Sequence, residues 1–151
     1  MIDNFDKAYG FLSNFSESPF VFMNETWPTV EHAFQAYKSR EKPIRDHIRG
    51  LKESRDAKRA GKAVVYRNDW HDIREPLMEM LVGAKFIQNE ELASRLVKTS
   101  DQSLIEGNFW HDNDWGDCRC DNCHDKPGKN MLGKILMKVR QSLIDTRVIC
   151  Q

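Results

Sequence analysis

Apolar residues recur at the three-to-four-residue spacing of an amphipathic helix in three stretches of the chain. The spacing predicts a helix over residues 29–40, a longer helix that follows Asn68 or Asp69, and a last helix over residues 131–144. Their core-facing positions are Val30, Ala33, Phe34 and Tyr37, then Ile73, Leu77, Met80, Leu81, Ala84 and Ile87, then Leu132, Ile135, Leu136, Val139 and Leu143. Thr29 or Pro28 suits the start of the first helix.

Shorter elements complete the pattern. Turn and charge signals predict helices over residues 43–48, 51–60 and 90–98, the second of them ending at Gly61. Short extended segments are expected over residues 18–22, 63–66 and 102–106. Residues 107–129 are polar, aromatic and cysteine-rich without any period, as is typical of a functional loop. We therefore expect a mainly α protein, a single compact helical domain over residues 1–151 with a few short β-strands.

Composition limits the classes of function. Of 151 residues, 40% are hydrophobic and 30% are charged, as in an ordinary soluble domain. Lys plus Arg and Asp plus Glu both number 23, which argues against a protein that coats nucleic acid but not against a small basic pocket. Residues 1–11 do not resemble a signal peptide, and no apolar run is long enough to cross a bilayer. We expect a cytoplasmic protein with no membrane partner, and the sequence leaves its oligomeric state open.

Two carboxylates and an aromatic residue are candidates for hydrolytic chemistry. Glu31 lies on the first predicted helix, Trp70 at the start of the longest one and Asp112 in the irregular loop. In cleavage of an N-glycosidic bond, one carboxylate polarises water or stabilises the oxocarbenium-like state and the other handles a proton of the leaving group. An aromatic ring stacks on the flat base. The alternatives are a solvated Glu31, a Trp70 that packs as a hydrophobic staple and an Asp112 that orders a turn.

Other signatures add little or are absent. Lys38 falls on the same helical flank as Glu31, where it could neutralise a phosphate or attack a sugar C1 as an amine; the alternative is a surface lysine. Lys85 could snorkel beside Phe86. Asn130 could cap the last helix, whose N-terminus could receive a phosphate, although an ordinary cap is the alternative. The motifs of P-loop, Rossmann, serine-hydrolase and zincin enzymes are absent.

The cysteines form a distinctive local pattern. Cys118, Cys120 and Cys123 lie in a C-x-C-x2-C-H run, and reduced thiols this close favour a soft divalent metal such as structural zinc. Adjacent Cys123 and His124 cannot easily bind one ion together, so the fourth ligand could be His111 or Cys150 as well as His124. The alternative is a loop of small thiols without metal.

The chain resembles the NADAR family, which includes N-glycosidases of riboflavin-biosynthesis intermediates. Five segments carry the resemblance, occur in the family's order and cover nearly the whole chain: YGFLSNFSESPF (9–20), WPTVEHAFQAYK (27–38), NDWHDIREPLMEMLVGAKFIQNEEL (68–92), LIEGNFWHDNDWGD (104–117) and GKNMLGKILMKVR (128–140). The resemblance implies a compact, mainly α-helical fold and hydrolysis of an N-glycosidic bond to ribose. The implied substrates are phosphorylated riboflavin-pathway intermediates or ADP-ribose attached to guanine in DNA.

The resemblance also implies roles for individual residues. Glu31 and Asp112 would be the two catalytic carboxylates, with Asp114 as an alternative to Asp112 because the loop is one residue longer than the family form. Lys38 would act in the ribose pocket as a Schiff-base nucleophile or electrostatic stabiliser, and Trp70 would wall in the substrate. The residues assigned to substrate binding are Asn14, Phe15, Lys85, Trp115, Gly116 and Asn130.

Two functions from different classes follow. The first is a glycosidase that needs no cofactor for catalysis and acts on a nucleotide-like metabolite or on ADP-ribosylated nucleic acid. The second is a zinc-stapled module that binds ADP-ribose or nucleic acid without turning it over, and it rests on the cysteine run and the aromatic loop.

Overall fold

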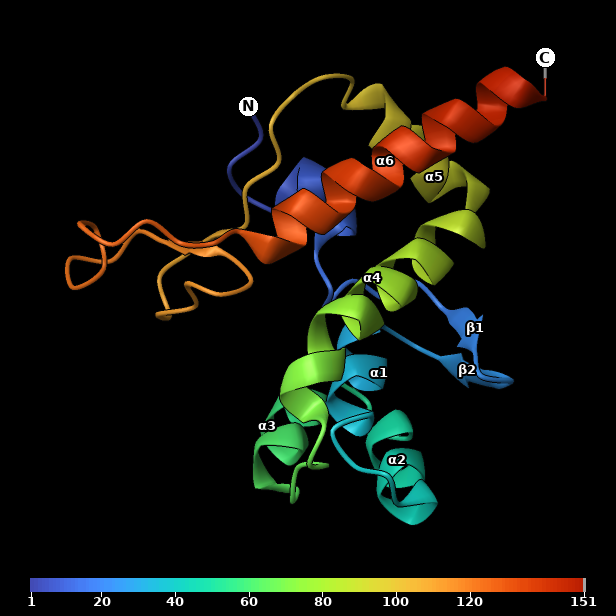
Figure 1. Ribbon diagram of the computed structural model, residues 1–151, viewed down its shortest axis with the longest axis vertical. Coiled ribbons are helices and arrows are strands. Elements are labelled where there is room, and N and C mark those ends of the chain that lie inside the picture. Colours follow the sequence, from blue (N-terminus) through green and yellow to red (C-terminus); the bar gives the residue numbers. More distant parts are fainter. Residues whose placement is uncertain (151) are drawn as a thin grey trace. The chain divides into compact units, whose positions relative to one another are not determined.

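The computed structural model describes residues 1–150, and these are mainly helical (Figure 1). The helices are a short 3-10 helix η1 (Lys7–Leu12), α1 (Val30–Ala36), α2 (Lys42–Arg49), α3 (Ser54–Ala63), α4 (Trp70–Ile87), α5 (Glu90–Lys98) and α6 (Met131–Ile149). The strands are β1 (Phe20–Phe22), β2 (Glu25–Trp27), β3 (Gly107–Asn108) and β4 (Asp117–Cys118). The expected class, mainly α with a few short strands, is confirmed. No helix within residues 1–150 has the length and apolar character needed to cross a membrane.

The chain divides into two compact units. The central unit comprises residues 14–89, and the terminal unit comprises residues 1–13 together with the chain from Glu90 onward. The central unit contains β1, β2 and α1 to α4, and the terminal unit contains η1, α5, β3, β4 and α6. The assignment of residues 1–151 to a single domain stays a prediction.

Helix α1 is the core of the central unit. All of its residues are buried, and it packs against α2, α3 and α4. Its first turn is held by two acceptors: the Thr29 hydroxyl oxygen accepts from the His32 backbone N–H, and the Asn14 carbonyl accepts from the Glu31 N–H. The His32 ring, which has no exposed surface, bonds to Thr29 Oγ1 and to the Leu51 carbonyl. The first turn of this buried helix and the His32 ring therefore have fixed hydrogen-bond partners.

Helix α1 is shorter than expected. It ends at Ala36 rather than near residue 40, and Lys38 lies in the turn that follows. The Lys38 N–H still bonds to the Gln35 carbonyl, but the Lys38 carbonyl accepts from the Arg67 N–H on the segment between α3 and α4. That segment, expected as a strand over residues 63–66, is an extended connection instead. A tertiary hydrogen bond therefore ends the helix where periodicity alone would continue it.

The prediction that the third helix ends at Gly61 is wrong. Helix α3 continues to Ala63, and a Cβ atom at Gly61 would overlap the side chain of Gln35 on α1. The glycine therefore allows two helices to approach closely.

The expected strand at residues 18–22 is confirmed as β1, which pairs antiparallel with β2. Met23 and Asn24 join them with φ values of 53° and 61°, as a two-residue hairpin turn requires.

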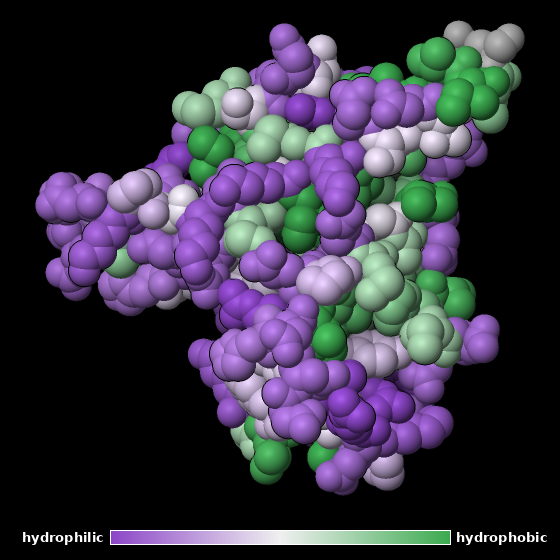
Figure 2. Space-filling view, viewed as in Figure 1, coloured by the Kyte–Doolittle hydropathy of each residue, from purple (hydrophilic) through white to green (hydrophobic). Residues whose placement is uncertain are grey.

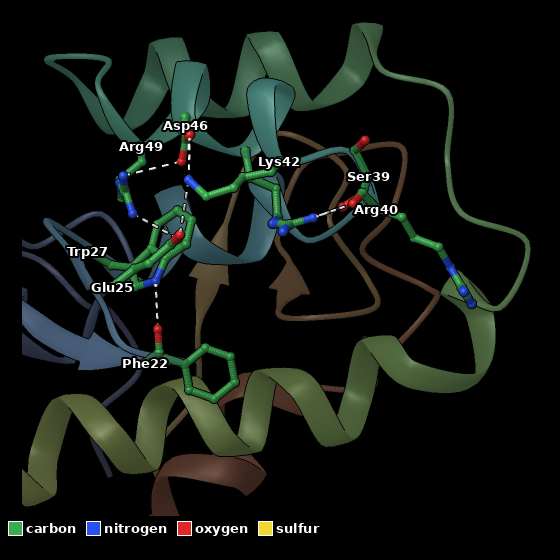
Figure 3. Close-up of polar contacts among 9 residues, drawn as sticks. Phe22, Glu25, Trp27, Ser39, Arg40, Lys42, Asp46 and Arg49 are labelled. Carbon is green, nitrogen blue, oxygen red and sulfur yellow. Dashed lines mark hydrogen bonds and ion pairs between the residues drawn. The ribbon is translucent and has the colours of Figure 1, made fainter.

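Ion pairs join the hairpin to α2 (Figure 3). Glu25 at the start of β2 lies 2.7 Å from Arg49 and 3.6 Å from Lys42, and both cations also pair with Asp46 on their own helix. The Trp27 indole N–H donates to the Phe22 carbonyl across the turn. Solvent-exposed pairs of this kind contribute about 0–1 kcal/mol each, so this network fixes position more than it adds stability.

The terminal unit is built on the packing of α5 against α6. Buried Arg140 of α6 donates to the Thr99 hydroxyl and the Gln102 carbonyl just beyond α5, at 2.8 and 2.9 Å. Ile2 pairs with Leu104 in a parallel bridge, which gives the extended segment expected near residues 102–106. Strands β3 and β4 also pair in parallel, and the loops around them extend from the start of α6 as a mainly hydrophilic surface (Figures 1 and 2).

Candidate active site

Glu31 is a buried carboxylate in the first turn of α1. Its residue is 6% exposed, and its Oε1 accepts a 2.7 Å hydrogen bond from the Gln35 amide one turn later. The alternative of a solvated glutamate is therefore wrong. Burial of a carboxylate costs free energy unless it is hydrogen-bonded, and carboxylates held in this way occur often at catalytic sites.

Lys38 and Trp70 lie together in an aromatic cluster. Lys38 is 8% exposed, and its Nζ donates to the Tyr66 hydroxyl at 3.2 Å. The same Nζ lies 4.8 Å from the centre of the Tyr66 ring and 5.9 Å from that of Trp70. Trp70, the first residue of α4, is 4% exposed, and its ring centre lies 5.0 Å from that of Phe34 on α1. Lys38 is thus not an ordinary surface lysine.

Asn14 and Phe15 lie at the start of the central unit and differ in exposure. The carbonyl of buried Asn14 accepts from the Glu31 N–H, and its amide contacts the Met78 sulfur on α4 at 3.4 Å. Phe15 is half-exposed, with its carbonyl bonded to the Ser54 hydroxyl and its ring 5.7 Å from the Lys58 ammonium. Asn14 therefore adjoins Glu31 through its backbone, and a role for Phe15 in binding stays a prediction.

Lys85 is fully buried, so the expectation that it snorkels to solvent is wrong. It is 1% exposed, and its Nζ lies 5.1 Å from the centre of the Phe86 ring. Burial disfavours the charged ammonium and lowers the pKa of Lys85 to about 7. Near neutral pH this lysine can hold or release a proton, which is a property shared by many functional lysines.

Asp112 orders a turn in the loop between β3 and β4. Its Oδ1 accepts from the backbone N–H groups of Asp114 and Trp115 at 3.2 and 2.9 Å. The buried Asn108 side chain accepts from the Asp112 N–H and donates to its carbonyl, which fixes the backbone at this position. Asp114 instead forms an exposed ion pair with Lys129. Of the two acids, Asp112 has the more constrained carboxylate.

Gly116 and Asn130 have structural roles that the sequence did not suggest. A Cβ atom at Gly116 would overlap the Glu106 carbonyl, so this position tolerates only glycine without adjustment. Asn130 precedes α6 with φ 49°, but its side chain does not cap the helix and instead bonds to Glu106 N and Leu104 O. The Met131 and Leu132 N–H groups donate to the carbonyls of Asp114 and Trp115. These helix donors already have partners, which removes support for a phosphate at this helix end.

The cysteine pattern converges with one histidine. His111, Cys118, Cys120 and Cys123 place four donor atoms within 4.8 Å of one another. His124 and Cys150 do not belong to this cluster.

The predicted site residues are divided between the two units. Glu31, Lys38, Trp70, Lys85, Asn14 and Phe15 belong to the central unit, whereas Asp112, Trp115, Gly116 and Asn130 belong to the terminal unit. The convergence of Glu31 with Asp112 stays a prediction. Sequence reasoning missed Gln35 and Tyr66, the partners of Glu31 and Lys38. The four-residue spacing of Glu31 and Gln35 on a helix was a signal for the first, and nothing local pointed to the second.

Comparison with known proteins identifies relatives along the whole chain. The NADAR domain family model matches residues 2–144. The N-glycosidase YbiA of Escherichia coli is 37% identical over 137 residues, which are 89% of this chain and 82% of that protein. The N-glycosidase Npun_R5314 of Nostoc punctiforme is 34% identical, over 91% of this chain and 87% of its own. The riboflavin biosynthesis protein VVA0006 of Vibrio vulnificus is 35% identical over 91% of this chain but only 36% of its own length.

A solved structure has the same fold. The NMR structure of E. coli YbiA superposes with a TM-score of 0.83 at 33% identity and covers 98% of this chain and 89% of that one. The family model and the relatives cover the segments that contain both the Glu31–Lys38 region and the Asp112 loop. The chain belongs to the NADAR domain family.

Proposed function

We propose that the protein is an N-glycosidase that hydrolyses the bond between a base-like group and a phosphorylated ribose or ADP-ribose. The observation that carries this proposal is the buried Glu31 carboxylate, which accepts a hydrogen bond from Gln35. Lys38, three residues after Gln35, lies in the aromatic cluster with Tyr66 and Trp70. Relatives named N-glycosidases over most of their length support the reaction class. The cytoplasm, where the thiols stay reduced, is the proposed location.

The proposed reaction divides the work among five residues. Trp70 and Tyr66 wall in the ribosyl group, and Glu31 polarises water or stabilises the oxocarbenium-like state at C1. Asp112 handles the proton on the leaving base, and Lys38 acts at the ribose as a nucleophile or as a positive charge. Water is the only co-reactant, so this chemistry needs no cofactor.

Two substrate classes remain within this proposal. A relative named a riboflavin biosynthesis protein supports a free riboflavin-pathway intermediate. ADP-ribose attached to guanine in DNA is the other class, because a flipped base needs one pocket and a few phosphate contacts. Incubation of the protein with each substrate, followed by mass spectrometry, would show ribose 5-phosphate in the first case and ADP-ribose in the second.

Replacement of Glu31 by Gln tests the catalytic assignment. We expect Glu31→Gln to lower turnover by at least about 100-fold, since general acid–base groups contribute about 10²–10⁴ to the rate. The amide keeps the size of the side chain, so circular dichroism and the unfolding midpoint should change little. Glu75→Gln, at an exposed position of α4, is the matched control and should keep full activity. Unchanged turnover in Glu31→Gln would refute the role of this carboxylate.

The second function, a binding module without turnover, has its own support. The loop after β3 exposes two adjacent aromatic side chains, Phe109 and Trp110, beside the His/Cys cluster. Exposed rings of this kind can stack on bases. Tight binding of ADP-ribose with no product from either substrate class would favour this function over hydrolysis.

A further inference from the structure

Four metal-ligand side chains gather in the terminal unit, in the segment that also contains Asp112. His111, Cys118, Cys120 and Cys123 each offer one donor atom, and all four atoms lie within 4.8 Å of one another. Cys118 is buried, Cys120 and Cys123 are half-buried, and all three are free thiols. Residues two to twelve positions apart are thus brought to one point by the turn after β3 and by strand β4.

The distances within the cluster fit one shared ion. His111 Nδ1 lies 3.2 Å from Cys120 Sγ and 3.4 Å from Cys123 Sγ. In a tetrahedral site with Zn–S bonds of about 2.3 Å and Zn–N bonds of about 2.1 Å, neighbouring N and S ligands lie about 3.6 Å apart. One ring nitrogen has a single N–H or a single lone pair to offer. A nitrogen that faces two sulfurs at once is therefore better explained by coordination than by a pair of hydrogen bonds.

Backbone hydrogen bonds hold the ligand residues of the cluster in place. The Cys118 N–H donates to Asn113 Oδ1 at 2.8 Å, and the Cys123 N–H donates to the Cys120 carbonyl at 2.9 Å. Partners that orient the ligands in this way are a regular part of metal sites.

The structure also decides which residue is the fourth ligand. His124 follows Cys123 directly, and its Nδ1 bonds to the Asp121 carbonyl while its Nε2 faces Asp125. Cys150 is exposed at the C-terminal end of α6. Of the three candidates, only His111 places a donor atom among the three sulfurs.

We propose that His111 Nδ1 and the thiolates of Cys118, Cys120 and Cys123 bind one Zn²⁺ ion in a closed, tetrahedral, structural site. Three thiolates and an imidazole select zinc over the hard cations Mg²⁺ and Ca²⁺, which prefer oxygen ligands. Four protein ligands leave no position for a reactive water, so the ion has no direct part in hydrolysis. On binding, each thiol releases its proton to solvent. The ion closes the loops over residues 111–123 and fixes the backbone next to Asp112.

Metal content of the purified protein tests the site independently of any enzymatic activity. We expect about one zinc ion per chain by inductively coupled plasma mass spectrometry. Replacement of zinc by Co²⁺ should give the intense visible bands of a tetrahedral site together with thiolate-to-cobalt charge transfer. Cys120→Ser and His111→Ala should lose most of the metal, whereas Cys150→Ser, the matched control outside the cluster, should retain it.

A second measurement does not depend on the variants folding. Arg119 lies in the proposed metal-closed loops, so chelation of the wild-type protein should accelerate tryptic cleavage after this residue several-fold. Re-addition of zinc should restore resistance. The proposal would be overturned by wild-type protein that is purified without metal, gives no cobalt spectrum, and has thiols at Cys118, Cys120 and Cys123 that react with a disulfide reagent as fast as exposed Cys150. A Glu31→Gln variant that binds zinc but does not turn over substrate would support the metal site, because its loss of activity would then come from the missing carboxylate.

Discussion

Lys85 shows how one buried residue can couple the fold to pH. Lys85 is a buried residue of α4, and burial lowers its pKa from 10.5 to about 7. The unfolded chain keeps the proton up to about pH 10.5, whereas the folded protein releases it near pH 7. Between these values the unfolded state binds more protons, so the free energy of unfolding rises with pH. Below pH 7 the destabilising effect of the buried lysine is complete and constant.

Substitution of this lysine should therefore stabilise the protein in a pH-dependent way. A difference of 3.5 pKa units corresponds to about 5 kcal/mol. We expect Lys85→Met to raise the free energy of unfolding by up to this amount at pH 6–7, and by almost nothing near pH 10.5. Urea denaturation across this range measures the difference from wild type, with exposed Lys62→Met as the control. A difference that does not change with pH would contradict the effect, and lost activity in a stabilised Lys85→Met would indicate a functional lysine.

Lys38 can be tested for covalent attack. An amine that attacks C1 of the ribosyl group expels the base, and opening of the sugar ring then leaves an imine at Lys38. Borohydride added during turnover should reduce this imine to a stable amine, which mass spectrometry would locate at Lys38. The adduct should be absent from Lys38→Arg, which keeps the charge but lacks the nucleophile. Full turnover of Lys38→Arg with no adduct in either protein would instead assign an electrostatic role to the lysine.

At the scale of elements, close backbone contacts hold the loop that contains Asp112. A Cβ atom at Gly116 would overlap the Glu106 carbonyl and lie 2.7 Å from the Asn108 amide nitrogen. We expect Gly116→Ala to destabilise the protein by about 1–3 kcal/mol, the range seen for overpacked sites. Gly83→Ala within α4 is the matched control, because nothing lies within 4 Å of its new Cβ. Alanine there should be neutral or stabilise the helix by up to about 1 kcal/mol. Equal unfolding midpoints for the two variants would contradict this account.

Periodicity predicted the existence of the helices better than their ends. The apolar stripes located α1, α4 and α6, because each of them needs a face for the core. For α4 the predicted face was partly wrong, since Met80 and Ile87 are exposed and Met78 and Phe86 are buried instead. The end of α1 depends on the hydrogen bond from Arg67 to Lys38. The need for glycine at position 61 depends on the position of the Gln35 side chain. Both are contacts between residues more than 25 positions apart, which a local pattern does not contain. For the same reason the sequence named Glu31 and Lys38 but did not show that both are buried.

At the scale of the whole molecule, charge balance limits how the protein can use a nucleic acid. The chain has 23 basic and 23 acidic residues, and part of the basic set is already paired on the surface, as in the contacts of Lys42 and Arg49 with Glu25 and Asp46. A protein that binds DNA along its length needs many unpaired cations, because each neutralised phosphate releases counterions. A substrate held in one pocket needs only one or two such contacts.

The salt dependence of binding should therefore be shallow for ADP-ribosylated DNA. Each phosphate contact contributes a slope of about −0.7 to −0.9 in a plot of log affinity against log salt concentration. With one or two contacts we expect a slope of about −1 to −2 for ADP-ribosylated DNA, measured on Glu31→Gln so that the substrate persists. Free ADP-ribose has no layer of condensed counterions and should give a shallower slope, and unmodified DNA of the same sequence should bind far more weakly. A slope of about −5 or steeper for the DNA would reveal an extended basic surface, and recognition would then reach well beyond the modified base.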